Sequence, residues 1–170
     1  QIRMTVEKVD LIDSVLGLDP KSSTYVARHF REKVLQGTQA SYEALFSPDL
    51  NLALPIRWVV AVYASQLMQA TELHQHYLDQ ALQINAPTEW LEAVAQDNPG
   101  VVIDPIVQAI LVFTRTLTLK PIEGDKAALQ QLAQSGLPTA DCIALSQLIA
   151  FLSYQARLVT GLKAMVALEQ

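Results

Sequence analysis

The stretch TADCIALSQLIAFLSYQARLVTGLKAMVAL (139–168) decides the fold class. Its apolar residues recur every three or four positions, which is the repeat of an α-helix. They cover more than one side, and a helix that is apolar on two sides is typical of the centre of a bundle. We therefore expect a central helix over this stretch. Its main face consists of Leu148, Leu152, Val159 and Leu162, with Phe151, Leu158 and Met165 beside it.

The rest of the sequence has the same periodicity, without the alternating β-branched runs of strands. Asp104-Pro105 starts a helix, because aspartate caps a helix and proline suits its first turn. The sequence predicts one all-α domain over 1–170, with an N-terminal arm over about 1–20. The expected earlier helices are 7–16 ended by Gly17, 24–46 with a possible break near Gly37, 55–82, a short helix over 90–94 capped by Thr88, 105–119, and a short helix capped by Asp125 and ended by Ser135-Gly136.

The two halves of the chain show a weak internal repeat. Leu54-Pro55 opens the helix expected over 55–82, and Leu137-Pro138 opens the last helix. Two similar long helices, one in each half, predict a pseudo-duplicated bundle.

Composition excludes several classes of protein. Of 170 residues, 51% are hydrophobic and 17% are charged, which is too apolar for a disordered chain. The net charge of −5 argues against binding nucleic acid through its phosphates. A soluble domain with so few charges hides apolar area against other chains. We therefore expect a homo-oligomer: a dimer, trimer or hexamer.

Cys142 is the one cysteine in the sequence, so an intrachain disulfide, a cysteine-based zinc site and a CxxC redox pair are all excluded. We expect a buried, inert thiol, and a reactive thiol beside Asp141 is the alternative. The sequence predicts no metal and no cofactor. Residues 1–8 lack the apolar core of a signal peptide, and the charge-free stretch 58–71 is too short to cross a bilayer. We expect a cytoplasmic protein away from membranes, with a native start at Met4.

Several segments come in a characteristic order. In the second half ILVFTRTLT (110–118) is followed by DCIAL (141–145), IAF (149–151) and QARL (155–158). In the first half LPIR (54–57) leads into an Ala- and Val-rich helix that reaches His76-Tyr77. This order resembles the carboxymuconolactone decarboxylase and alkylhydroperoxidase D superfamily, including its peroxidase-related branch, over roughly residues 35–165.

The resemblance implies an all-α, alkylhydroperoxidase D-like bundle that assembles as a trimer or hexamer. Its peroxidase chemistry uses a glutamate, a CxxC pair and a histidine four residues after the second cysteine. Carried onto His76, that pattern puts Glu72 and Gln69 at the cysteine positions and Arg57 at the glutamate position. In the register that ends at His74 the cysteines are also missing. We therefore expect no thiol-peroxidase cycle.

A continuous helix over 55–82 would put Arg57, Gln69, Glu72 and His76 on one face. We interpret Glu72 and His76 as candidate catalytic acid/base residues, and Arg57 and Gln69 as candidate substrate-binding residues for a small carboxylated molecule. The alternative is a solvated or interface face with one salt bridge. Two functions therefore stay open: an acid/base enzyme, and a non-catalytic small-molecule-binding or scaffold oligomer.

Other polar residues have simpler interpretations. We expect His74 in the core, because its helical neighbours are apolar, and His76 on the polar side of the same helix. We expect His29 on a solvated face. Arg157, near the middle of the last helix, is expected to be buried against a carboxylate. Trp58 and Trp90 are expected to anchor the core or an interface.

Overall fold

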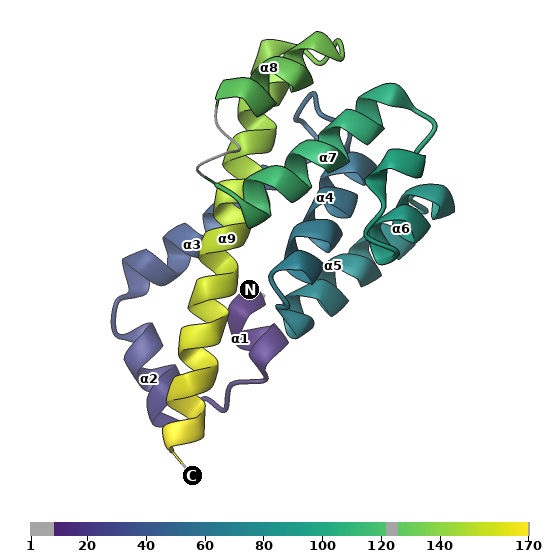
Figure 1. Cartoon of the computed structure of the whole chain (residues 1–170). Coiled ribbons are helices and arrows are strands. Elements are labelled where there is room, and N and C mark those ends of the chain that lie inside the picture. Colours follow the sequence, from purple (N-terminus) through teal and green to yellow (C-terminus); the bar gives the residue numbers. More distant parts are fainter. Residues whose placement is uncertain (1–8, 122–125, 170) are drawn as a thin grey trace, which may run out of the picture.

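The computed structural model describes residues 9–121 and 126–169, and every regular element in these ranges is helical. The all-α prediction is therefore confirmed. The helices, labelled in Figure 1, are α1 (Leu11–Leu16), α2 (Ser23–His29), α3 (Glu32–Leu45), α4 (Leu54–Leu67), α5 (Thr71–Gln83), α6 (Thr88–Ala95), the short 3₁₀ helix η1 (Pro99–Val101), α7 (Pro105–Leu119), α8 (Lys126–Gln134) and α9 (Thr139–Leu168).

Helix α4 lies at the centre of the structure. Residues 57–65 are all buried, so this helix has no solvent-facing side over nine positions. It packs against α5, α6, α7 and α9. Val60, Ala61 and Ala64 are fully buried, and their small side chains let the neighbouring helices approach closely.

Helix α9 runs the length of the molecule, from α8 at one end to α1 and α2 at the other (Figure 1). Its buried residues pack on α4 and α7, but Ile143, Tyr154 and Leu168 are exposed on its outer side. Helix α9 contacts α1, α2, α3, α4, α7 and α8, as expected of a central helix, but its outer side is open to solvent within the described residues. At the far end the Glu169 carboxylate accepts hydrogen bonds from Ser23 and Thr24 at the start of α2.

By length and composition, α9 could cross a membrane, a test that the core helix of a soluble protein also passes. No other helix in the described ranges passes it. The packing of α9 on α4 and α7 is compatible with a soluble protein.

Several helices end in the same backbone motif. After α4 the amide of Gln69 donates to the carbonyl of Gln66 and the amide of Ala70 donates to the carbonyl of Ser65. This is the Schellman arrangement, whose central residue has a left-handed backbone. Gln69 has φ 55°, and Asn85 and Asp97 occupy the corresponding left-handed positions after α5 and α6. Asn85 and Asp97 belong to the residue types that tolerate this backbone, whereas Gln69 does not, so the sequence carries no obvious signal for the end at Gln69.

The motif at Gln69 overturns one prediction. The expected helix over 55–82 is two helices, because the chain turns at residues 68–70 and α5 then packs against α4. The two long helices that suggested a duplicated bundle are therefore unequal, with 14 residues in α4 and 30 in α9. The helix expected over 24–46 is also divided, at Phe30 and Arg31 and not at Gly37.

Several other helix boundaries were predicted correctly, but α1 begins at Leu11, and Thr88 is the first residue of α6 and not its cap. The Asp104 side chain accepts the amides of Ile106 and Val107 at the start of α7. Helix α9 begins and ends where its sequence indicates. Gly17 and Gly136 end α1 and α8 with left-handed backbones. The expected cap at Asp125, and the residues before 9, lie outside the described residues.

A glycine scan of this turn tests the division into α4 and α5. Gln69→Gly is expected to leave the free energy of unfolding unchanged or to raise it by up to about 1 kcal/mol, because glycine adopts the left-handed backbone without steric cost. Gln75→Gly in the exposed middle of α5 is the control and is expected to lose about 1 kcal/mol. The measurement is chemical denaturation. Equal losses for both variants would mean that one helix continues through Gln69.

Candidate functional site

Arg57 lies inside the protein, with 2% of its surface exposed. Its Nε donates to the carbonyl of Leu52 at 2.8 Å, and its Nη1 donates to the carbonyl of Leu45, the last residue of α3, at 2.9 Å. The guanidinium therefore caps the carboxyl end of α3, where the helix dipole favours a positive charge. Its Nη2 is buried without a partner among the described residues, and burial lowers the pKa of Arg57.

Glu72 forms an ion pair across two helices. Its carboxylate lies 2.7 Å from Nζ of Lys163 on α9, and both side chains are partly exposed. The hydrogen bond from Lys163 is the main cause of the lowered pKa of Glu72. The pair sits at a hollow of about 300 Å³ whose wall includes Leu16 and Val166.

His76 points toward α3. Its Nε2 lies 2.8 Å from the hydroxyl oxygen of Tyr42. The imidazole ring also contacts the rings of Trp58 and Tyr77, at centroid distances of 6.5 and 5.2 Å. Burial lowers the pKa of His76, and burial together with Glu43 raises the pKa of Tyr42 to about 12. Both partners of this hydrogen bond are therefore neutral at pH 7.

The aromatic rings around His76 join several helices. Phe46, directly after α3, stacks on Trp58 of α4 with centroids 4.0 Å apart. Tyr77 of α5 is fully buried, and its hydroxyl donates to the side-chain oxygen of Gln155 on α9. Burial raises the pKa of Tyr77 well above its ordinary value. The four rings of Tyr42, Phe46, Trp58 and Tyr77, with His76, form what we call the aromatic cluster.

The four predicted site residues do not share one helix face. The break at residues 68–70 places Arg57 on α4, Gln69 exposed in the turn, and Glu72 and His76 on α5. Glu72 bonds to Lys163 and His76 to Tyr42, so the two do not form the expected carboxylate–imidazole pair. The geometric argument for a common site is therefore wrong, because it assumed a continuous helix. Catalytic and substrate-binding roles for these residues stay predictions.

Other residue expectations have mixed outcomes. Cys142 is buried, as expected, and burial is the first cause of its raised pKa. Trp58 lies in the core, and Trp90 is partly buried and packs against the core. Arg157 is exposed, so its expected burial is wrong. His74 is half-buried with its pKa lowered by burial, but the assignment of His76 to a polar face is wrong, because His76 belongs to the aromatic cluster.

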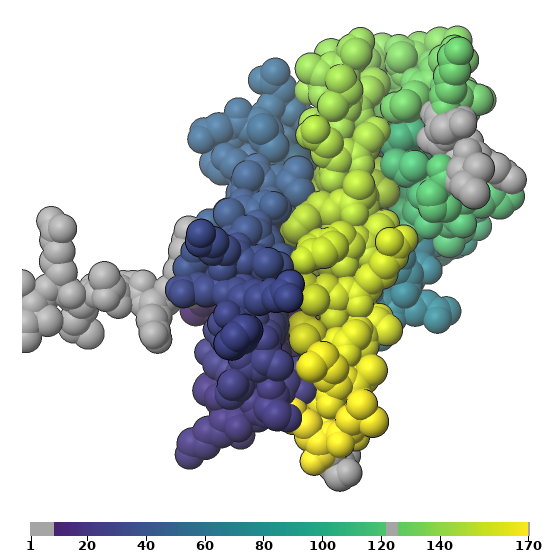
Figure 2. Space-filling view, turned by 90° about the vertical axis from the view of Figure 1, so that its left-hand side faces the viewer, coloured from purple at the N-terminus to yellow at the C-terminus, as the bar shows by residue number. Residues whose placement is uncertain are grey.

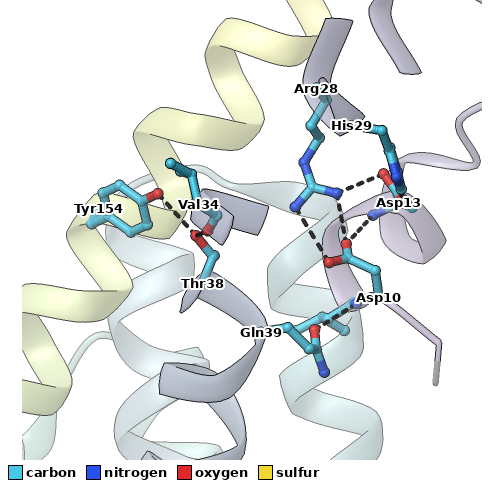
Figure 3. A network of polar contacts seen from close by, with 9 residues as sticks. Asp10, Asp13, Arg28, His29, Val34, Thr38, Gln39 and Tyr154 are labelled. Atoms are coloured by element: carbon cyan, nitrogen blue, oxygen red, sulfur yellow. Dashed lines mark hydrogen bonds and ion pairs between the residues drawn. The ribbon is translucent and has the colours of Figure 1, made fainter. Parts of the chain in front are cut away.

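A polar cluster between α1 and α2 was missed by the sequence (Figure 3). The Arg28 guanidinium donates to Asp10 at 2.8 Å and to Asp13 at 2.7 Å, and His29 Nε2 lies 2.7 Å from the other Asp13 oxygen. The His29 ring also stacks on Tyr25. The expectation of a solvated His29 is therefore wrong. The sequence pattern that could have indicated this cluster is a pair of aspartates at positions i and i+3, followed later in the chain by an Arg-His dipeptide.

This polar cluster borders a cavity of about 790 Å³ between α1, α2 and α3. Arg28 of α2 is ion-paired with both Asp10 and Asp13 of the α1 end, so the cluster joins two helices and has an evident structural role. Within residues 9–121 and 126–169, no group of three His, Cys, Asp or Glu side chains is arranged to hold a metal ion.

Comparison of the chain with protein-family models, with curated proteins and with solved structures gives no significant match. The superfamily resemblance therefore rests on the sequence segments alone.

Alanine variants of the two α5 histidines test the placement of the aromatic cluster. His76→Ala is expected to lower the free energy of unfolding by about 2 kcal/mol or more, because it leaves the Tyr42 hydroxyl without its partner and opens a gap among rings. His74→Ala, the matched control, is expected to lose less, since His74 has no partner of this kind among the described contacts. Thermal and urea unfolding give the ranking. A larger loss for His74→Ala would contradict this placement.

Proposed function

We propose that this chain is a carboxymuconolactone decarboxylase/alkylhydroperoxidase D-like helical protein that acts as a self-associating, non-catalytic scaffold in the cytoplasm. The observation that carries the proposal is an exposed apolar surface on α2, α3 and α9. We call it the Phe30 face, and it consists of Val26, Phe30, Val34 and Tyr154.

The Phe30 face has the features of an interface between copies of the chain. Phe30 is 88% exposed at the break between α2 and α3, and Val26 and Val34 are more than half exposed on either side of it. Figure 2 shows α2 and α3 lying alongside α9 on this side of the molecule. An exposed phenylalanine among other apolar side chains loses contact with water when a second surface covers it, which favours association.

A hollow beside Phe30 supplies the complementary shape. It measures about 200 Å³, and Leu35, Leu158 and Tyr154 are among the residues that line it. In a two-fold symmetric dimer the same patch meets itself, so Phe30 of each copy enters the hollow of the other. Two charged residues also line this hollow: Arg28, which is ion-paired with Asp10 and Asp13, and Arg31, which is exposed. A second copy of this chain therefore suits the surface.

The contacts of the other candidate residues support a scaffold over an enzyme. The Cys142 thiol is buried, and its raised pKa disfavours the reactive thiolate. Glu72 and His76 are engaged with different helices and do not support one another as acid and base. Arg57 is enclosed by backbone carbonyls and lines none of the hollows described above.

Light scattering coupled to size-exclusion chromatography tests the scaffold proposal. The wild type is expected to exceed the chain mass of 18.7 kDa by an integral factor at tens of micromolar. Phe30→Glu is expected to give the monomer, because it places a charge in the apolar interface. Ile103→Glu, at another highly exposed position, is the control and is expected to keep the wild-type mass. A monomeric wild type, or an unchanged mass for Phe30→Glu, would contradict the proposal.

A further inference from the structure

A further hollow lies between α7, α8 and α9, on a different side of α9 from the Phe30 face. It measures about 430 Å³, within the range of small-molecule pockets. Phe113 and Leu117 of α7, Leu129 of α8 and Ile149 of α9 form its apolar wall. Phe113 and Ile149 belong to the core, so the base of the hollow is a packed surface. Leu129 is exposed and leaves apolar area open to water.

The α9 edge of this hollow is polar. Ser153 and Arg157 are four residues apart, so they lie on the same side of the helix one turn from each other. Arg157 is the one charged residue among the described residues that line the hollow. Arg28 and Arg115 form ion pairs with aspartates, whereas Arg157 is exposed and has no ion pair or hydrogen bond among the described contacts. Its guanidinium is available to an anion.

We infer that this hollow binds a small molecule that has an apolar body and a single carboxylate. The guanidinium of Arg157 donates two parallel hydrogen bonds to the carboxylate, which is the geometry that its planar fork favours. The Ser153 hydroxyl lies one turn away and can donate a third. The apolar body covers Leu117 and Leu129 and removes their surface from water.

The charge count limits the kind of ligand. A single cation balances one carboxylate, whereas a dicarboxylate or a phosphate monoester dianion would leave a negative charge against the apolar wall. An uncharged apolar molecule would bury the wall but would leave Arg157 unpaired. The inference concerns a ligand and does not depend on self-association, because the Phe30 face and this hollow share no residue.

Isothermal titration calorimetry with octanoate as the probe tests the site. Octanol has the same body without the charge, and acetate has the carboxylate without the body. Octanoate is expected to bind saturably at one site per chain and at least tenfold more tightly than either comparison compound. Amide chemical shifts are expected to change along α7 and α9 around the hollow. Binding of octanol as tight as that of octanoate, shifts elsewhere, or no saturable binding would overturn the inference.

Charge variants assign the site to Arg157. Arg157→Gln is expected to weaken octanoate binding by about tenfold or more and to leave octanol binding unchanged, because it removes a charge-assisted hydrogen bond. Lys21→Gln removes the same charge from an exposed position in the loop before α2 and is expected to have no effect. Circular dichroism checks that both variants are folded. Equal octanoate affinities for Arg157→Gln and wild type would exclude Arg157 as the carboxylate partner.

Octanoate binding by the Phe30→Glu variant, whose mass in solution is measured first, tests this inference separately from the scaffold proposal. Phe30→Glu is expected to bind octanoate with the wild-type affinity even as a monomer. Loss of octanoate binding in the Phe30→Glu monomer would contradict the independence of the two surfaces.

Discussion

The buried guanidinium of Arg57 is the interaction on which the first half of the structure depends. Burying an arginine is costly unless its donors find acceptors. Here the carbonyls of Leu45 and Leu52 accept, and both lie in the chain that leads from α3 into α4. The charge therefore fixes the end of α3 against the most buried helix. The same two hydrogen bonds also fix the ends of the loop over residues 46–53, which connects α3 to α4.

The fixed position of α3 makes the aromatic cluster possible. Phe46 can stack on Trp58 because Arg57 holds the end of α3 beside α4. One turn earlier on α3, Tyr42 reaches His76 of α5. The cluster then continues through Tyr77 to α9. The rings and their polar groups thus join α3, α4, α5 and α9, and the hydroxyls of Tyr42 and Tyr77 both have hydrogen-bond partners inside the protein.

The surfaces that remain open lie on both sides of α9. This helix is covered on the side that faces α4 and α7, and its exposed residues border two hollows of different character. The hollow beside Tyr154 is lined by the exposed Phe30 together with Arg28 and Arg31, whereas the hollow beside Arg157 has an apolar wall and a single cation, which has no ion pair among the described residues. The first suits a second apolar surface and the second suits an apolar anion. Both proposals therefore follow from what α9 leaves uncovered.

The sequence predicted the parts of the fold that depend on local rules. Asp104 capped its helix as expected, and the repeat of apolar residues defined α9 correctly over 139–168. The candidate site depended on the helix over 55–82, which failed because Gln69, a residue without left-handed preference, takes a left-handed backbone. Periodicity cannot show that turn. The partner of His76 was also invisible, since Tyr42 is 34 positions away and only packing brings them together.

Unfolding of an Arg57→Met variant tests whether the Arg57 guanidinium holds α3 and α4 together. Methionine fills a similar volume but donates no hydrogen bond, so two buried carbonyls lose their partners. If Arg57 holds the protein together, the free energy of unfolding falls by about 3 kcal/mol, and near-ultraviolet circular dichroism shows a changed environment for the aromatic cluster. If Arg57 were retained for binding an anion, it would reduce stability. Its replacement would then leave the free energy of unfolding unchanged or raise it. An Arg57→Met variant as stable as the wild type would show that these helices do not depend on the buried guanidinium.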